Sequence, residues 1–114
     1  MSVTSGQLLN SVKQHIAEIT ADEVQKQLGA GDKIHIVDVR ERDEFMDGYI
    51  SGAALIPRVF LELNIEEDVT MDRSAEIVLY CAGGNRSALA ARDLAFMGYT
   101  NVKSMIGGFK GWKD

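Results

Sequence analysis

The sequence of 114 residues contains one cysteine, one proline, two histidines and no long apolar run. A single cysteine cannot form an internal disulfide, so we predict a reducing environment and a cytoplasmic protein. His15 and His35 stand far apart with only one cysteine to join them, so we predict no metal site. We also expect no membrane span and no signal peptide, because the apolar stretches are short and the N-terminus lacks a basic start.

Positive charge is in the minority. The chain has 12 lysine and arginine residues against 17 aspartate and glutamate residues, which gives a net charge of -5. We therefore predict neither nucleic acid nor a membrane as a partner. An anionic substrate would have to be attracted by local positive charge. The length allows one domain with a single hydrophobic core.

Short apolar runs alternate with helix-like segments along the chain. We predict strands at residues 34–39, 53–56, 77–80 and 102–106, and helices at residues 21–28, 41–46 and 87–97. The only proline, Pro57, marks the end of the second strand, because proline cannot donate to a sheet ladder. This alternation predicts an α/β fold with a mostly parallel sheet and helices on both faces.

The N-terminal residues form a predicted unit of their own. Residues 5–16 carry apolar side chains at helical spacing, so we predict a helix there. We treat residues 1–16 as an N-terminal helical extension of a main domain at residues 17–114. Packing of this helix on the main domain is favoured over a role as a handle for another protein.

The segment after Pro57 is expected to contain a candidate site residue, a helical turn and a solvated connection. Arg58 directly follows the proline and could lie beside the ends of the other strands. We predict a helical turn at residues 59–63 that brings Phe60 and Leu61 into the core. The acidic, polar stretch at residues 62–74 is interpreted as a solvated connection.

The only cysteine lies where a predicted strand is followed by a helix. The segment reads Cys81-Ala82-Gly83-Gly84-Asn85-Arg86-Ser87. The first amides of a helix have no partner within it and favour an anion, and adjacent glycines let further amides turn inward. A sulfur in such a loop is stabilised as the nucleophilic thiolate. The alternative is a free cysteine that is merely a small buried hydrophobe, but the glycines and the helix start favour the catalytic interpretation.

Charged residues follow the strand predicted at residues 34–39. Asp38, Arg40 and Glu44 lie near its carboxyl end, where parallel sheets place functional groups. They could instead form an internal ion-pair network that holds the turn, because partly buried charges must be paired. We favour the network, with Asp38 and Arg40 as structural support.

From about residue 19 to residue 112, the chain resembles the rhodanese (sulfurtransferase) family. The matching pieces are Ile36-Val37-Asp38-Val39-Arg40 followed by Glu44-Phe45, Gly48-Tyr49-Ile50-Ser51-Gly52-Ala53 followed by Ile56-Pro57, the loop from Cys81 to Ser87, and Gly107-Gly108 with Trp112. Each piece alone is weak evidence. Together and in this order they are specific.

The resemblance implies a single rhodanese-like domain with a five-stranded parallel sheet flanked by helices. It also implies that Cys81 accepts a sulfane sulfur as a persulfide and passes it to a thiophile. The implied donor is a small sulfur-containing anion or a persulfide, and the implied acceptor is a thiol, cyanide or a protein sulfur carrier. No metal or organic cofactor is needed. The expected substrate-binding residues are Ala82, Gly83, Gly84, Asn85, Arg86 and Ser87 of the loop, with Arg58 as a further candidate.

Loop length separates the enzymatic alternatives. Four residues lie between Cys81 and Arg86, whereas phosphatases and arsenate reductases of the related fold have one more, so phosphatase activity is the lesser interpretation. A non-catalytic interaction module is the other alternative, although the retained cysteine loop speaks against it. Many family members have histidine where this chain has Tyr49. Ala82 and Gly83 supply no positive charge to bind the thiosulfate dianion. A polysulfide or a protein persulfide would need less positive charge from the loop than thiosulfate does. We also expect these small residues to leave the thiol open to a bulky donor.

Overall fold

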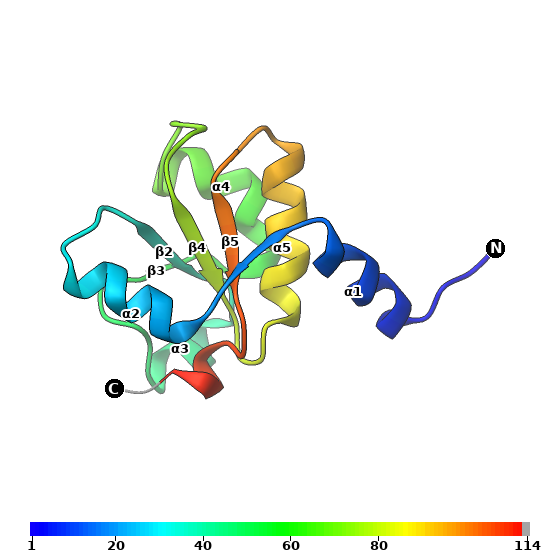
Figure 1. Ribbon diagram of the computed structural model, residues 1–114, viewed down its shortest axis with the longest axis horizontal. Coiled ribbons are helices and arrows are strands. Elements are labelled where there is room, and N and C mark those ends of the chain that lie inside the picture. The colour runs from blue at the N-terminus through cyan, green and yellow to red at the C-terminus, as the bar shows by residue number, and fades with distance from the viewer. Residues whose placement is uncertain (113–114) are drawn as a thin grey trace.

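Five parallel strands form one sheet, in the order β1-β5-β4-β2-β3 (Figure 1). The computed structural model describes residues 1–112. The strands are β1 (Ala17–Ile19), β2 (His35–Asp38), β3 (Ala54–Leu55), β4 (Ile77–Tyr80) and β5 (Val102–Met105). Because every strand runs in the same direction, the loops that follow the carboxyl ends gather along one edge of the sheet. The predicted five-stranded parallel sheet is confirmed.

Helices cover both faces of this sheet. They are α1 (Ser5–Gln14), α2 (Ala21–Gly29), α3 (Arg42–Met46), α4 (Leu61–Asp68) and α5 (Asn85–Phe96), with short 3-10 turns η1 (Arg58–Phe60) and η2 (Phe109–Gly111). Among residues 1–112, none of the helices has the length and apolar character that crossing a membrane requires.

The core consists of two layers, one on each side of the sheet. Val37 and Leu79 point to one face and pack with Leu94 of α5. Ile36 points to the other face and packs with Val24 of α2. Neighbouring strand residues face opposite sides, and β2 and β4 are apolar on both. Because β4 is the middle strand of the sheet, its carboxyl end lies in the centre of the sheet edge.

The edge strand β1 is an element that the periodicity does not predict. It has three residues, of which only Ile19 is buried, so it shows neither an apolar run nor a clear alternation. Its pairing with β5, with Ile19 opposite Met105, defines it as a strand. A tertiary partner, and not local preference, therefore creates this element.

Helix α4 corrects two sequence expectations. Part of the acidic stretch predicted as a solvated connection is helical, because Leu61 and Ile65 lie one turn apart and are fully buried. The acidic side chains occupy the outer surface of the same helix. Phe60, which we expected in the core beside Leu61, is half exposed, so that expectation is wrong. Consecutive residues at a helix start point in different directions, and only Leu61 faces the sheet.

The N-terminal helix α1 packs against α5, on the side away from the middle of the sheet (Figure 1). Thr4 and Gln7 form a capping box at its start, and Val12 is its one fully buried residue. Near its end, the Lys13 ammonium donates to Asn85 Oδ1 at 3.2 Å. Helix α1 thus contacts Asn85, which is the first residue of α5 and belongs to the cysteine loop.

Candidate active site

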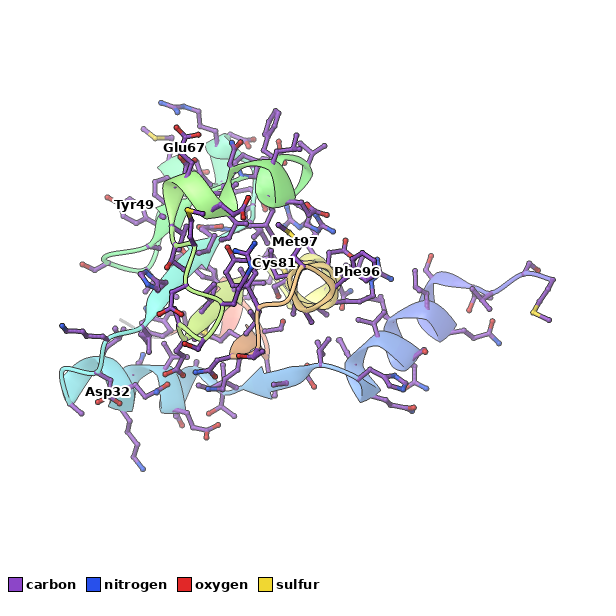
Figure 2. The ribbon with its side chains drawn as sticks, turned by 90° about the horizontal axis from the view of Figure 1, so that it is seen from above. Asp32, Tyr49, Glu67, Cys81, Phe96 and Met97 are labelled. Atoms are coloured by element: carbon purple, nitrogen blue, oxygen red, sulfur yellow. The ribbon has the colours of Figure 1, made fainter. Side chains whose placement is uncertain are left out.

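Cys81 directly follows β4, and its sulfur is surrounded by hydrogen-bond donors of the loop. The Gly84 amide donates to Sγ at 3.1 Å and the Ser87 amide at 3.4 Å, while Ser87 Oγ lies 3.5 Å away. Figure 2 shows Cys81 among the central side chains, beside α5. Helix α5 begins at Asn85, so Ser87 belongs to its first turn, where amides have no partner within the helix. Gly84 has a φ of 107°, a conformation that glycine adopts without strain.

These donors change the acidity of the thiol. Burial by itself would raise the pKa of Cys81. Hydrogen bonds from the Ser87 hydroxyl and from the amides of Ser87, Gly84 and Gly83 outweigh this effect and lower the pKa below its ordinary value. The loop therefore favours a thiolate at this position.

Access to the sulfur differs from the sequence expectation. Cys81 is only 1% exposed, so the prediction of a thiol open to a bulky donor is wrong. The reason is that Cys81 belongs to the core layer under α5, and the chain after β5 closes over its carbonyl group. Gly83, whose amide also acts on the sulfur, is exposed, and apart from its chain neighbours no atom lies within 4 Å of where a Cβ would stand. A reagent must therefore present a slender end to reach Sγ.

The loop arginine is already engaged. Arg86 binds Glu44 of α3 through two hydrogen bonds of 2.8 and 3.0 Å. The Arg86 guanidinium lowers the pKa of Glu44 to about 2, and Glu44 in turn raises the pKa of Arg86. Sequence reasoning grouped Glu44 with Asp38 and Arg40, whereas the structure assigns it to the cysteine loop.

Arg58 does not join the loop. Its guanidinium binds Glu62 of α4 at 2.8 Å and also forms an ion pair with Asp93 of α5. Asp93 lies eight residues after the first residue of α5, which is about 12 Å along the helix axis. The predicted loop residues lie together around Cys81. Arg58, in contrast, forms its ion pairs with residues outside the loop.

Asp38 and Arg40 form a buried ion pair at the end of β2. The Arg40 guanidinium binds both carboxylate oxygens at 2.6 to 3.0 Å and donates to the Gly48 carbonyl at 2.7 Å. It also lies over the rings of Tyr80 and Phe109, at 5.6 and 4.5 Å from the centroids. This pair joins the ends of β2 and β4 to the C-terminal turn η2.

Replacing Asp38 should show how much this pair matters for stability. The variant Asp38→Asn leaves the Arg40 charge buried without its counter-ion, so we expect a loss of about 3–5 kcal/mol in the free energy of unfolding. Urea titration followed by circular dichroism measures the loss. Glu66→Gln is the control, since its ion pair with Arg73 is exposed and should be worth under about 1 kcal/mol. Equal effects of the two changes would contradict the assigned role.

The C-terminal turn holds the cysteine loop from outside. The Phe109 amide donates to the Cys81 carbonyl at 2.7 Å, and the Lys110 amide donates to the Ala82 carbonyl at 3.1 Å. Gly108 makes this approach possible, because a Cβ there would overlap both carbonyl groups. Sequence reasoning noted the glycine pair but did not predict its contact with the loop, which only the packing shows.

A second residue that sequence reasoning missed is Ser104 of β5. Its hydroxyl lies 2.8 Å from the Ser87 hydroxyl, and both residues are buried. The available signal was a serine two residues after Val102, on the face of the strand that points into the core. Such a residue needs a hydrogen-bond partner in the core.

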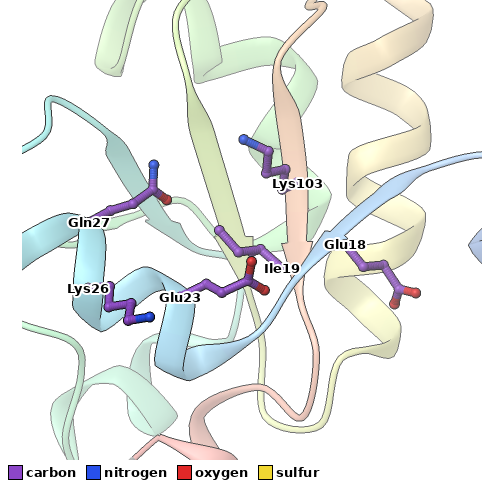
Figure 3. Close-up of a pocket in the computed structure, with 6 residues that line it drawn as sticks. All are labelled: Glu18, Ile19, Glu23, Lys26, Gln27 and Lys103. Carbon is purple, nitrogen blue, oxygen red and sulfur yellow. The ribbon is translucent and has the colours of Figure 1, made fainter.

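A separate surface hollow of about 380 Å³ lies between α2, β1 and β5 (Figure 3). Its lining residues are Glu18, Ile19, Glu23, Lys26, Gln27 and Lys103. The hollow shares no residue with the cysteine loop. Within residues 1–112, no three His, Cys, Asp or Glu side chains gather in a way that could hold a metal ion.

Comparison with known proteins supports an origin in one family. The Rhodanese-like domain profile matches residues 20–114. The chain is 32% identical over 80 residues to the thiosulfate sulfurtransferase GlpE of Coxiella burnetii, which covers 70% of this chain and 72% of GlpE. It is 29% identical over 97 residues to YrkF of Bacillus subtilis, a protein provisionally named as a sulfur carrier, and this match covers 85% of the chain but only 51% of YrkF.

A solved structure extends the likeness over nearly the whole chain. A Rhodopseudomonas palustris protein of unknown function, RPA3614, described as a possible tyrosine phosphatase, superposes with a TM-score of 0.85 at 30% identity. The superposition covers 98% of this chain and 90% of that one. Together with the parallel sheet and the profile match over most of its length, these findings show that the chain belongs to the rhodanese-like sulfurtransferase family.

Proposed function

We propose that this protein is a sulfurtransferase in which Cys81 carries the transferred sulfur. In the first step the Cys81 thiolate attacks the outer sulfur of a donor. A new S–S bond forms, the donor's own bond to that sulfur breaks, and the donor fragment leaves with the bonding electron pair. In the second step a thiolate or cyanide attacks the outer sulfur of the persulfide, and Cys81 leaves as the thiolate again.

The observation that carries this proposal is the set of donors around Sγ. The Gly84 and Ser87 amides donate to Sγ, and the Ser87 hydroxyl, 3.5 Å away, can donate to it once the thiol has lost its proton. Both half-reactions begin or end with a thiolate at this atom, so the two backbone amides, which are fixed donors, assist each of them without rearrangement. The chain has no second cysteine, so the sulfur must leave to an external acceptor.

The charges around the loop favour a donor with little negative charge. Arg86 is bound to Glu44, and Arg58 is bound to Glu62 and Asp93, so neither arginine is free to bind the thiosulfate dianion. The buried sulfur also requires a slender donor end. We therefore propose a polysulfide or a protein persulfide as the donor, and a small thiol or protein sulfur carrier as the acceptor. The single free cysteine fits a reducing compartment, so we place the reaction in the cytoplasm.

Intact-mass measurement tests the function directly. The folded protein is treated separately with thiosulfate, inorganic polysulfide and a small persulfide, and we expect the mass of one sulfur atom to be added to the peptide that contains Cys81. Cyanide should then remove it as thiocyanate. Cys81→Ser is the control, because it keeps the loop but lacks the nucleophile and should gain no sulfur. A folded protein that never gains sulfur from any donor would refute the proposal.

Glu44→Gln tests the assigned donor preference. The change removes the carboxylate that neutralises Arg86, so binding of a dianion should improve. We expect the KM for thiosulfate to fall about two- to fivefold, which corresponds to about 0.5–1 kcal/mol at a partly exposed site. Glu66→Gln removes the carboxylate of an ion pair that has no loop member, and the KM should not change. A KM in Glu44→Gln that is unchanged or higher would contradict this view of the loop.

The phosphatase alternative has its own measurement. RPA3614 is described as a possible tyrosine phosphatase, so an aryl phosphate should be tested beside the sulfur donors. With four residues between Cys81 and Arg86, and Arg86 paired with Glu44, we expect no turnover of the aryl phosphate. Hydrolysis that requires Cys81, without any persulfide, would replace the sulfurtransferase proposal.

A further inference from the structure

A chain of three side chains leads from Cys81 into the core. Ser87 Oγ lies 3.5 Å from Cys81 Sγ and 2.8 Å from Ser104 Oγ, and it also lies 3.3 Å from the Gly84 carbonyl oxygen. Ser87 and Ser104 are 0% and 1% exposed, so solvent does not serve either hydroxyl. Ser104 stands beside Leu79 in the ladder between β4 and β5, where its side chain faces α5.

The number of protons decides how these hydroxyls must be oriented. Each serine has one O–H to donate. In the structure, Ser104 Oγ has the Ser87 hydroxyl as its side-chain partner. If Ser87 donated to Ser104, the thiolate would lose its hydroxyl donor. The Ser104 proton could then not be accepted by Ser87 Oγ. If Ser104 donates to Ser87, the one proton of Ser87 is free for Sγ or for the Gly84 carbonyl.

Ionisation of the thiol then selects one of these two acceptors. A thiolate is a stronger acceptor than a neutral carbonyl, so Ser87 donates to Sγ once the thiol loses its proton. A hydroxyl that accepts a hydrogen bond is polarised and donates more strongly, so the Ser104 bond reinforces the bond from Ser87 to Sγ.

We propose that Ser104 is a positioning residue: by donating to Ser87 Oγ, it directs the proton of Ser87 at the Cys81 thiolate. Its place in the sulfur-transfer reaction rests on the function proposed above. Its effect on the acidity of Cys81 does not, because that effect depends only on the hydrogen bonds of the folded protein.

The charged groups around this chain are held in contacts of their own. Glu44 of α3 binds Arg86 of α5, Asp38 binds Arg40 at the end of β2, and Lys13 of α1 binds the side-chain carbonyl of Asn85. The pKa of Glu44 is about 2, and the pKa values of Arg86 and Arg40 are raised. Glu44, Arg86 and Arg40 therefore do not titrate in the range in which the thiol loses its proton, which lies below the ordinary cysteine pKa of 9.0.

The test is the pH dependence of alkylation of the folded chain by iodoacetamide, followed by intact mass. Only a thiolate reacts with iodoacetamide, and Cys81 is the only cysteine in the sequence. The midpoint of the curve of alkylation rate against pH therefore reports the ionisation of Cys81 alone. We expect Ser104→Ala to raise the midpoint by about 0.5 unit and Ser87→Ala to raise it by about one unit. Adding Ser104→Ala to Ser87→Ala should cause no further shift, because the proposed effect passes through Ser87.

Two further comparisons separate hydrogen bonding from packing. Val102→Ala shortens a side chain on the same face of β5 and should lower stability without moving the midpoint. Ser104→Thr and Ser104→Val have nearly the same shape, and only the valine variant should raise the midpoint. This pair decides the matter if Ser104→Ala fails to fold.

Three results would overturn the proposal. The first is an unchanged alkylation midpoint in Ser104→Ala. The second is a Ser104→Ala shift that is just as large in the Ser87→Ala background, and the third is a shift in Val102→Ala equal to that in Ser104→Ala. In the sulfur-transfer assay of Ser104→Ala, the midpoint of the pH profile of kcat/KM should shift by as much as the alkylation midpoint. The value of kcat/KM at high pH should stay that of the parent. If the protein accepts no sulfur at all, the proposed function fails. The alkylation series still decides whether Ser104 acts on the thiolate.

Discussion

Cys81→Ser is expected to reduce sulfur transfer to the rate without protein, a loss of roughly a thousandfold or more. A serine hydroxyl is not ionised near neutral pH and forms no persulfide, so both half-reactions lose their nucleophile. The side chain is nearly the same size and stays within the same donors of Gly84 and Ser87. The fold should therefore survive, and a thiocyanate assay with polysulfide as donor measures the loss.

Two controls sharpen this result. Ser87→Ala keeps the cysteine, so it should still form a persulfide with a pH optimum displaced to higher pH. Circular dichroism of Cys81→Ser should match that of the parent. If folded Cys81→Ser transfers sulfur at the rate of the parent, the proposed reaction is wrong, and the fold would serve another role.

Gly108→Ala is expected to disrupt the cysteine loop without changing any of its residues. Gly108 has a φ of 56°. A Cβ at this position would lie 2.5 Å from the Ala82 carbonyl oxygen and even closer to the Cys81 carbonyl oxygen, so backbone must move. The bonds from Phe109 and Lys110 to these carbonyls would be lost or stretched. We expect at least a hundredfold loss of activity and a stability loss of about 2–4 kcal/mol.

Neighbouring glycines provide matched controls for this change. Gly107 has a φ of 80°, but a Cβ there meets nothing nearer than 3.9 Å, so Gly107→Ala should cost only the backbone strain of about 1–2 kcal/mol. Gly111→Ala has neither the strain nor a contact and should resemble the parent. The comparison uses kcat/KM together with urea unfolding. If Gly108→Ala were no worse than Gly107→Ala, the contact between the turn and the loop would not matter for the site.

Several features follow from the sequence by itself because their causes are local. The apolar runs of β2 and β4, the glycines of the cysteine loop and the helix after it are each defined within a few residues. The parallel sheet then follows from the alternation of strands and helices. Asp38 and Arg40 are two residues apart at a strand end, so their pairing could also be anticipated.

Tertiary structure alone decided the features that join distant parts of the chain. Glu44 and Arg86 are 42 residues apart, and Ser87 and Ser104 are 17 apart, so no local pattern could pair them. The strand β1 exists because β5 lies beside it, and the burial of Cys81 depends on the packing around the end of β4. The sequence by itself identified a thiol in an amide-rich loop. How deeply that thiol is buried, and which charges and hydroxyls surround it, depends on contacts that form only when the whole chain has folded.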